Sequence, residues 1–537
     1  MTVILSVSSF STAGAEETPL LRVLLKRLDV FRRIDLQLEG QYMLQGKNGS
    51  SILFSRGSSV AVELRGSGLV LFFSGASTSL GESAQLTRQD DGGDAPALRI
   101  RGASGLYPGD LSLTVSDGRI QPVLSLSLED YLLGVVPNEM SDTFPSEALK
   151  AQAVCARTYA LRKIGRSGAW DVVDTTNDQV FRGISRSDVN SAQAVSETAG
   201  LVITKDGKLA EGYYSASNGG QTELPGNIWS GTAGSGCYAM QDDPWDSANP
   251  DSLTRTVEIP RDASCLYRRF TALLSDAVHS DPVWKNCGFS NAENAFRIDG
   301  FSSIRVKTPR YAAPSRLMTE LEVTLAVSGR KISGGTIGPF ESAGTMTVTL
   351  QIFPDVMDAL GLRVASSGNE IVTVEETDTG FILRSGRFGH GVGLSQRGAQ
   401  WMASNDGMSF DEILAFYFPG SQLSRYTEKT PALSSASPEL MKTPEPPAVS
   451  ATPQPALMPV TEDELPEGAW IASVEKINDG SSLNLRSDPS PVASVIMRLN
   501  KHQRLIVLDE MDVPGWAHVK TDDAEGYVMS SYLEPAE

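Results

Sequence analysis

The sequence predicts an α+β protein with several domains, and three observations support that prediction. Short runs of alternating apolar and polar residues, separated by Gly and Ser pairs, fill the first part of the chain, as at 60–64 and 68–73. Apolar residues then recur with helical spacing at 128–136, and strand-like alternation returns at 320–352. A chain of 537 residues is too long for one ordinary core, and it suggests two to four domains of ~100–200 residues each.

The first three segments differ in pattern. Residues 1–18 are a disordered lead-in or a degenerate signal peptide, because they end in Ala-x-Ala but lack a basic start and a strong apolar run. Residues 19–123 indicate a β-rich N-terminal module. Residues 124–426 indicate a mixed core, in which Pro145-Ser146-Glu147 should open a second helix with the serine as its cap.

The last two segments indicate a linker and a small β domain. Residues 427–468 are crowded with Pro, Ser, Thr and Ala, which favours an extended, semi-stiff spacer. Residues 469–537 contain five short strand candidates closed by turns, about the size of a small barrel. Its aromatic residues could line a ligand groove or fill the core of the barrel; these are Trp516, Tyr527 and Tyr532.

Composition excludes one class of function. The formal net charge of −19 argues against a nucleic-acid partner, because phosphate backbones are bound by clustered Lys and Arg. No run of 18 apolar residues occurs, so no transmembrane helix is expected. Cys155 lies between small apolar residues of a helical pattern, which predicts a buried thiol. A Cys265–Cys287 bridge would be permitted in an oxidising compartment, and the sequence does not decide whether it forms.

Two distant segments contain the polar groups typical of a site. Residues 389–399, GHGVGLSQRGA, place a histidine, a serine and a glutamine among glycines, whose missing side chains would let another molecule approach the backbone. Far upstream, Glu139 follows an apolar run and lies beside Pro137 and Met140, where a raised carboxyl pKa is plausible. A protonated carboxylic acid of this kind is what cleavage of a glycosidic bond requires.

These segments together resemble a known family. With YYSASNGG at 213–220 and DPWD at 243–246 between them, they are similar to the SpoIID/LytB family, named for stage II sporulation protein D and an amidase enhancer. The resemblance spans roughly residues 120 to 425. Near the C-terminus, LNLRSDPS at 483–490 and GWAHV at 515–519 resemble bacterial SH3 domains, which commonly tether wall-acting proteins to peptidoglycan.

The resemblance implies roles for individual residues. Glu139 occupies the position of the family's catalytic glutamate. Lys150 and Arg157 lie seven residues apart, within about 20° around one helix, and would hold glycan groups or a neighbouring acid. The other expected substrate-binding residues are Tyr213, Tyr214, Ser217, Asn218, Gly220, Asp246, His390, Ser395 and Gln396.

No metal and no cofactor are expected. Some family members carry adjacent His and Cys after Asp-Thr-Thr, where they can bind zinc, whereas this chain has Asn177 and Asp178 there. Amide and carboxylate side chains are poorer zinc ligands than imidazole and thiolate. A Ser-His hydrolase built on Ser395 is disfavoured, because the sequence lacks a Gly-x-Ser-x-Gly elbow and a third member.

The resemblance implies a lytic transglycosylase of the bacterial cell envelope, with peptidoglycan glycan strands as substrate. It would cleave between N-acetylmuramic acid and N-acetylglucosamine in peptide-stripped strands and leave 1,6-anhydro ends, during sporulation and engulfment. The alternative is a non-catalytic, wall-binding enhancer of a partner amidase. A third possibility is that only the C-terminal module binds and the core is a scaffold.

Overall fold

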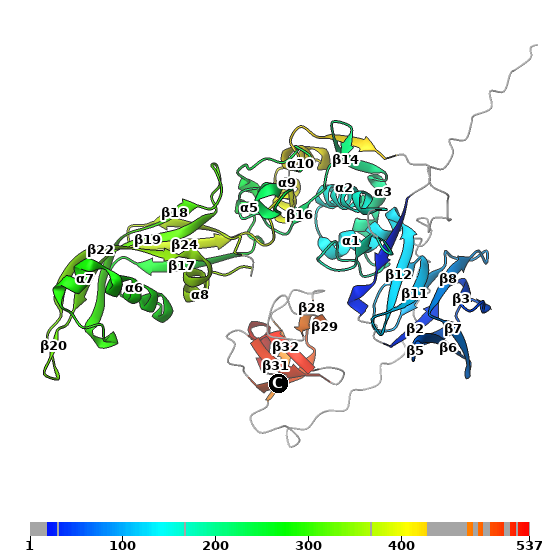
Figure 1. The fold of residues 1–537 in the computed structure, drawn as a ribbon, viewed down its shortest axis with the longest axis horizontal. Coiled ribbons are helices and arrows are strands. Elements are labelled where there is room, and N and C mark those ends of the chain that lie inside the picture. Colours follow the sequence, from blue (N-terminus) through cyan, green and yellow to red (C-terminus); the bar gives the residue numbers. More distant parts are fainter. Residues whose placement is uncertain are drawn as a thin grey trace, which may run out of the picture. The chain divides into compact units, whose positions relative to one another are not determined.

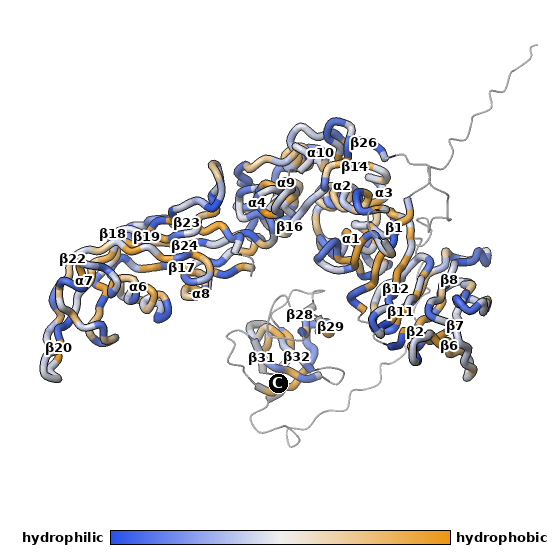
Figure 2. The backbone as a smooth tube through the Cα atoms, viewed as in Figure 1, coloured by the Kyte–Doolittle hydropathy of each residue, from blue (hydrophilic) through white to orange (hydrophobic). Residues whose placement is uncertain are grey.

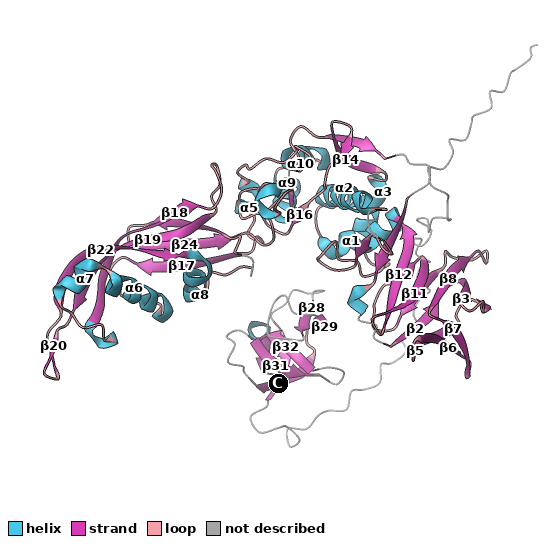
Figure 3. Ribbon diagram, viewed as in Figure 1, coloured by secondary structure: helices cyan, strands magenta, loops and turns pink. Residues whose placement is uncertain are grey.

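A computed structural model describes residues 19–28, 32–165, 168–232, 234–365, 368–426, 470–475, 482–486, 495–509, 516–521 and 525–535. The predicted lead-in and linker lie outside the described residues. The chain divides into two units, Met1–Lys442 and Thr443–Glu537, coloured by sequence in Figure 1. With about 23% helix and 42% strand, the structure confirms the predicted α+β class (Figure 3). Where the domain boundaries fall stays a prediction.

The N-terminal part is built from β-sheets that share one core. One sheet has the strand order β13-β1-β12-β11-β8-β3-β4 and another has the order β10-β9-β2-β5-β6-β7. Apolar residues alternate with polar ones along the strands, as Figure 2 shows, and the apolar faces of both sheets join one hydrophobic cluster. The strands are β1 (Leu20–Leu24), β2 (Arg33–Leu38), β3 (Gln41–Gly46), β4 (Ser51–Phe54), β5 (Ser59–Arg65), β6 (Gly68–Phe73), β7 (Ala76–Gly81), β8 (Ser83–Gln89), β9 (Ala97–Ile100), β10 (Leu106–Pro108), β11 (Asp110–Ser116), β12 (Arg119–Ser127) and β13 (Val172–Val173).

Helices α1 (Leu128–Glu139) and α2 (Ser146–Lys163) follow β12. Helix α1 begins where the Ser127 hydroxyl accepts a hydrogen bond from the Asp130 amide at 3.1 Å. The expected serine cap of α2 is wrong, because Pro145 is the N-cap residue, without a side-chain cap bond, and Ser146 is already helical. The ring of Pro145 fixes a φ that suits a helix start, so no serine cap is required.

Helix α2 is the centre of the core. It packs against α1, α3, α9, α10 and β14, so most of its residues are buried, from Ala148 to Leu161. A helix enclosed in this way is apolar or small-sided all round rather than amphipathic. The remaining elements here are α3 (Val189–Glu197), β14 (Leu201–Lys205), β15 (Lys208–Leu209), β16 (Tyr214–Ser215), α4 (Pro225–Ile228), α5 (Pro244–Ala248), β25 (Leu394–Ser395), α9 (Gln396–Asn405), α10 (Phe410–Tyr417) and β26 (Gln422–Arg425).

A β-rich insertion leaves the core through β17 (Thr254–Pro260) and returns through β24 (Gly380–Gly386). These two strands are antiparallel neighbours, with Thr254 opposite Gly386, so the chain before and after the insertion meets at one point. The insertion has its own hydrophobic cluster and confirms the strands predicted at 320–352. Its other elements are α6 (Arg268–Ser280), α7 (Pro282–Cys287), β18 (Phe296–Pro309), β19 (Met318–Gly329), β20 (Ile332–Ser333), β21 (Thr336–Ile337), β22 (Glu341–Gln351), α8 (Met357–Leu360) and β23 (Ile371–Glu376).

The C-terminal unit is a small sheet with the order β29-β28-β32-β31-β30-β27-β33 and a separate hydrophobic cluster. Its described residues form seven strands rather than the five expected. Trp516 is buried, whereas Tyr527 is half-buried and stacks on His518 with ring centroids 4.7 Å apart. The strands are β27 (Trp470–Val474), β28 (Ser482–Arg486), β29 (Val495–Asn500), β30 (Arg504–Asp509), β31 (Trp516–Lys520), β32 (Glu525–Met529) and β33 (Leu533–Pro535).

Two sequence expectations concern thiols and membranes. Cys155 is fully buried, as predicted. All four cysteines lie in the described residues and are free, so Cys265 and Cys287 do not form a bridge in this structure. Within the described ranges, none of the helices is both long enough and apolar enough to cross a membrane.

Candidate functional site

Glu139 is the last residue of α1, and its side chain is partly exposed. Its Oε1 accepts a hydrogen bond from the Val180 amide at 2.8 Å. Burial raises the pKa of the Glu139 carboxyl, while the Val180 amide and the polar side chains of Tyr214 and Gln396 act in the opposite direction. The net effect is upward, so a larger fraction of the carboxyl is protonated near neutral pH than for an ordinary glutamate.

Residues 179–182 pass beside the end of α1 and supply two groups that the sequence did not single out. The buried Gln179 amide donates to the Tyr214 hydroxyl at 3.0 Å. The Arg182 amide donates to the Gly134 carbonyl at 3.4 Å, while the Arg182 side chain is exposed and its charge acts on Glu139. Their only sequence signal is that they follow the Asp-Thr-Thr segment.

Strand pairing brings Tyr214 and Gln396 to Glu139. Strands β16 and β25 are parallel neighbours, with Tyr214 opposite Leu394, so Gln396 at the start of α9 lies close to Tyr214. The Gln396 amide also donates to the Gln152 side chain at 3.3 Å. The structure therefore gathers three predicted site residues, which come from distant parts of the sequence: Glu139, Tyr214 and Gln396.

An aromatic cluster continues from Tyr213. The Tyr213 ring lies 4.6 Å from Trp229 and 6.1 Å from His390, and Trp229 lies 4.9 Å from His390, as ring centroid distances. All three side chains are partly exposed. Partly exposed aromatic rings beside an acid offer flat faces for sugar rings. Sequence reasoning missed Trp229, because no motif surrounds it.

His390 is held as a neutral base. Its Nδ1 accepts a hydrogen bond from the Val392 amide at 3.0 Å. Burial, assisted by the nearby Arg387 charge, lowers the pKa of His390 to about 4. A hydrogen bond to the Tyr214 backbone acts in the opposite direction. Because Nδ1 accepts, Nε2 carries the proton in the neutral ring and is the donor to that backbone. His390 is therefore held by hydrogen bonds within the chain, and it is a poor proton donor in acid catalysis.

Four predicted ligand-binding residues form a buried network instead: Ser217, Asn218, Asp246 and Ser395. The Asp246 carboxylate accepts from the Ser217 hydroxyl at 2.9 Å, the Asn218 amide at 3.0 Å and the Ser395 hydroxyl at 2.5 Å. All four are at most 1% exposed. These four residues are therefore buried and hold neighbouring segments in place, and they do not lie at the surface of the site.

Asp243 and Gly220 complete that network. Asp243 caps α5 by accepting from the Asp246 amide at 3.0 Å, and it also accepts from Tyr417 at 2.6 Å and from the Asn218 side chain at 2.7 Å. Burial, followed by the neighbouring Asp246 charge, raises the pKa of Asp243 to about 6. Gly220 is buried, and a Cβ there would lie 2.1 Å from the Ser247 hydroxyl. It therefore permits packing rather than contacting a ligand.

Lys150 and Arg157 lie apart from this site. The Arg157 side chain is buried and binds both carboxylate oxygens of Glu129, each at 2.7 Å, which matches the expected neighbouring acid rather than a glycan. Lys150 pairs with Glu147 at 2.8 Å and Glu197 at 2.6 Å. The helical spacing placed Lys150 and Arg157 on one face of α2, but it could not show how deeply that face is buried.

Two glycines of residues 389–399 pack closely against other parts of this chain. A Cβ on Gly393 would lie 2.1 Å from the Tyr213 carbonyl oxygen, and one on Gly389 would lie 2.8 Å from the Ser215 Cβ. Gly389 and Gly393 therefore allow close packing against residues 213–215 of this chain. Next to this loop, Arg387 and Glu223 form a fully buried ion pair at 3.3 Å, which the sequence did not reveal.

After the Asp-Thr-Thr segment, where no metal is expected, Asp178 forms hydrogen bonds within the chain. It accepts hydrogen bonds from Tyr159 at 2.8 Å, Lys163 at 2.8 Å and the Val173 amide at 2.9 Å. Among the described residues, no group of three or more His, Cys, Asp and Glu is arranged to hold a metal ion. These contacts tie Asp178 to α2 next to the site.

Comparison with known proteins identifies the two units. Residues 116–204 match the family described as stage II sporulation protein, and residues 481–534 match the bacterial SH3 domain. The chain carries a SpoIID domain and a bacterial SH3 domain. Glu139 lies inside the matched SpoIID segment, whereas Tyr214, His390 and Gln396 lie beyond it. Both domains are related to the cell wall.

Individual relatives agree with these matches. The amidase enhancer of Bacillus subtilis is 29% identical over 55% of this chain and 40% of its own length. Stage II sporulation protein D of the same organism is 26% identical over 60% of this chain and 82% of its own length. The homologous protein of Bacillus amyloliquefaciens is 27% identical over 62% and 85%. The chain thus spans two fifths of the amidase enhancer.

Proposed function

We propose that this protein is a lytic transglycosylase that cleaves peptidoglycan glycan strands, with Glu139 as its acid and base. The observation that supports this proposal is the geometry of Glu139, a half-buried residue at the end of a helix, whose carboxyl has a pKa raised by burial and lies next to Tyr214 and Gln396. Such a group can remain protonated until it meets the leaving oxygen.

The proposed reaction needs one titrating side chain. Glu139 donates its proton to the glycosidic oxygen between N-acetylmuramic acid and N-acetylglucosamine, and that bond breaks. The carboxylate then takes the proton of the muramic acid C6 hydroxyl, whose oxygen bonds to the anomeric carbon and closes a 1,6-anhydro ring. The proton balance is complete, so no activated water is required, in contrast to the two-carboxylate hydrolases.

The residues around Glu139 would bind the substrate. Partly exposed Tyr213 and Trp229 offer surface for the sugar rings, and the neutral His390 ring packs against both of them. Arg182 carries an exposed positive charge near Glu139, suited to the lactyl carboxylate of muramic acid in peptide-stripped strands. The buried Asp246 network keeps the segments that contain these residues in place.

The alternative is a wall-binding enhancer of a partner amidase, which the name of one relative favours. One experiment separates the two functions. Wild type and Glu139→Gln are incubated with peptide-free glycan strands and with sacculi, and products are read by mass spectrometry. Anhydro ends from wild type alone support the transglycosylase. No products, with retained wall binding and stimulation of an added amidase, would support the enhancer.

A further inference from the structure

A pocket of about 510 Å³ lies on the outward face of the sheet β10-β9-β2-β5-β6-β7, in the N-terminal part of the chain. The inward residues of β2 are buried apolar side chains, whereas its outward residues are exposed or half-exposed and line the pocket. None of the lining residues belongs to the site around Glu139. This pocket has no part in the proposed cleavage.

Strand register explains the shape of the pocket. One row across the sheet runs from Arg99 on β9 through Gln37 to Ser59 on β5. The next row on the same face places Ala61 between Asp35 and Phe72. Side chains in such rows lie about 5 Å apart. Small residues at the two β5 positions therefore make a floor between taller neighbours.

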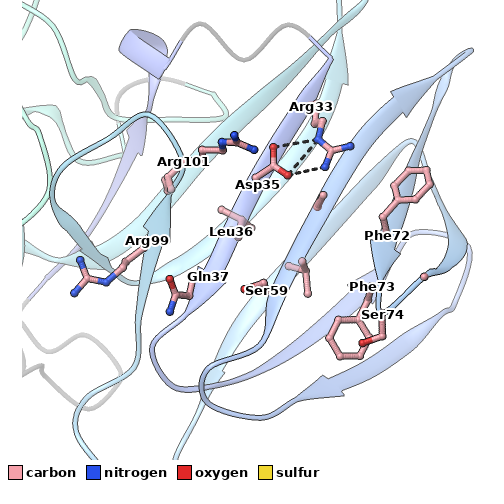
Figure 4. Close-up of a pocket in the computed structure, with 14 residues that line it drawn as sticks. Arg33, Asp35, Leu36, Gln37, Ser59, Phe72, Phe73, Ser74, Arg99 and Arg101 are labelled. Atoms are coloured by element: carbon pink, nitrogen blue, oxygen red, sulfur yellow. Dashed lines mark hydrogen bonds and ion pairs between the residues drawn. The ribbon is translucent and has the colours of Figure 1, made fainter. Parts of the chain in front are cut away.

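The two sides of the pocket differ in chemistry. Arg99 and Arg101 stand on the β9 side, and Phe72 stands on the β6 side, as Figure 4 shows. Arg33 lines the same pocket and pairs with Asp35 at 2.7 Å. The sheet thus carries arginine side chains on one side of the pocket and an aromatic ring on the other, with small side chains between them.

Of the arginines that line the pocket, Arg33 pairs with Asp35 and with Glu63, which lies outside the pocket. Three arginines line it against one carboxylate, in a chain whose formal net charge is −19. Arg99 pairs with Glu39 at 2.6 Å, and that pair is exposed enough to exchange for another anion. Within the described residues, the Arg101 side chain has no hydrogen-bond or ion-pair partner. The hydrogen bond from Arg33 lowers the pKa of Asp35, and the Arg101 charge acts in the same direction.

We propose that this pocket binds a carboxylate-bearing polysaccharide, with a sugar ring against Phe72 and a carboxylate on Arg99 and Arg101. Guanidinium groups pair with carboxylates through two parallel hydrogen bonds. The Arg65 guanidinium already lies over the Phe72 ring, 4.8 Å from its centroid, so a pyranose ring would pack on the remaining apolar surface of Phe72. Gln37 and Ser59 provide partners for hydroxyl groups. The aromatic side favours a sugar chain over a ring-free anionic polymer.

Two sources supply such a chain: peptide-stripped peptidoglycan, with lactyl carboxylates, or a uronic-acid polymer. The test uses the full chain with Glu139→Gln, so that no probe is cleaved. Binding of fluorescent peptide-stripped strands and of polygalacturonate is measured for Arg99→Gln/Arg101→Gln and for Ala61→Leu, which fills the floor. The control is Lys47→Gln, which removes one positive charge at an exposed residue outside the pocket.

We expect the arginine pair and Ala61→Leu to weaken binding of at least one acidic probe about tenfold, while Lys47→Gln changes it by less than about twofold. Neutral chitin oligosaccharides should not respond to the arginine changes. Hydrogen–deuterium exchange gives a local readout, with protection expected at 33–37 and 97–101. Unchanged affinity for both acidic probes in the arginine pair, without that protection, would overturn the proposal and leave Glu139-dependent cleavage untouched.

Discussion

At the scale of single residues, the fold disfavours the ionised form of the Glu139 carboxyl. Its pKa is raised in the folded protein mainly by burial. A carboxyl whose folded pKa lies above its unfolded value contributes stability below the unfolded pKa, and that contribution is lost as pH rises through the folded pKa. Under the proposed function, a Glu139 carboxyl that stays protonated for proton transfer thus costs stability near neutral pH, as functional sites often do.

The first prediction uses that cost. Glu139→Gln should be inactive yet at least as stable as wild type, and its advantage in melting temperature should grow between about pH 5 and pH 8. Thermal unfolding of both proteins across this range measures the difference. The control is Glu197→Gln, an exposed glutamate whose pKa is lowered by Lys150 and which should gain nothing. A Glu139→Gln advantage that does not vary with pH would contradict the prediction.

The second prediction concerns His390. Its folded pKa of about 4 lies below the value in the unfolded chain, so its contribution to stability is present above the unfolded pKa and is lost as pH falls toward about 4. His390→Asn should therefore reduce the loss of stability between about pH 6.5 and pH 4. Chemical denaturation at several pH values measures this slope. The same slope in wild type and in His390→Asn would contradict the prediction.

At the scale of elements, two basic residues on one helix illustrate what sequence reasoning can reach. The spacing of Lys150 and Arg157 correctly placed them on one face of α2. The spacing could not predict that Arg157 is buried. Its partners, Glu129 and two carbonyls, come from α1 and from residues in or near α3, which only the folded chain brings together. The segments containing Glu139, Tyr214 and Gln396 could be found from sequence, but the pairing of β16 with β25 could not.

The third prediction separates those two basic residues. Arg157→Leu should lower the free energy of unfolding by about 3 kcal/mol or more, because it leaves Glu129 without its buried partner. Lys150→Gln should change it by less than about 1 kcal/mol, because its pairs involve partly exposed glutamates. Urea unfolding measures both. Equal costs for the two variants would show that α2 is less enclosed than described.

The fourth prediction tests the β16–β25 junction. Gly393 and Gly407 both have left-handed φ, at 73° and 64°, but only Gly393 faces a close neighbour, the Tyr213 carbonyl oxygen. Gly407→Ala should cost about 1–2 kcal/mol of unfolding free energy from backbone strain alone. Gly393→Ala should cost more and should also reduce cleavage, because it separates Tyr214 from Gln396. Similar losses in both variants would contradict the role given to this packing.

At the scale of the whole molecule, the insertion explains why residues 149 positions apart in the sequence can belong to one site. The pairing of Thr254 with Gly386 returns the chain to where it left, so Asp246 and Ser395 can meet. Sequence patterns predicted strands in this region but not that they form a cluster of their own, because alternation identifies a buried face without showing which elements share it.

The last prediction concerns the two units. The SH3 unit has a hydrophobic cluster separate from those of residues 19–426, so removal of residues 443–537 should leave the SpoIID unit folded. Cleavage of short, soluble glycan strands should then proceed as in the full chain, whereas retention on sacculi should fall, because one of two linked binding modules is lost and with it the gain in effective concentration. Co-sedimentation with sacculi and mass spectrometry of soluble products measure the two effects separately. Unchanged sacculus binding would assign wall attachment to residues 19–426, and lost cleavage of soluble strands would show that the units depend on each other.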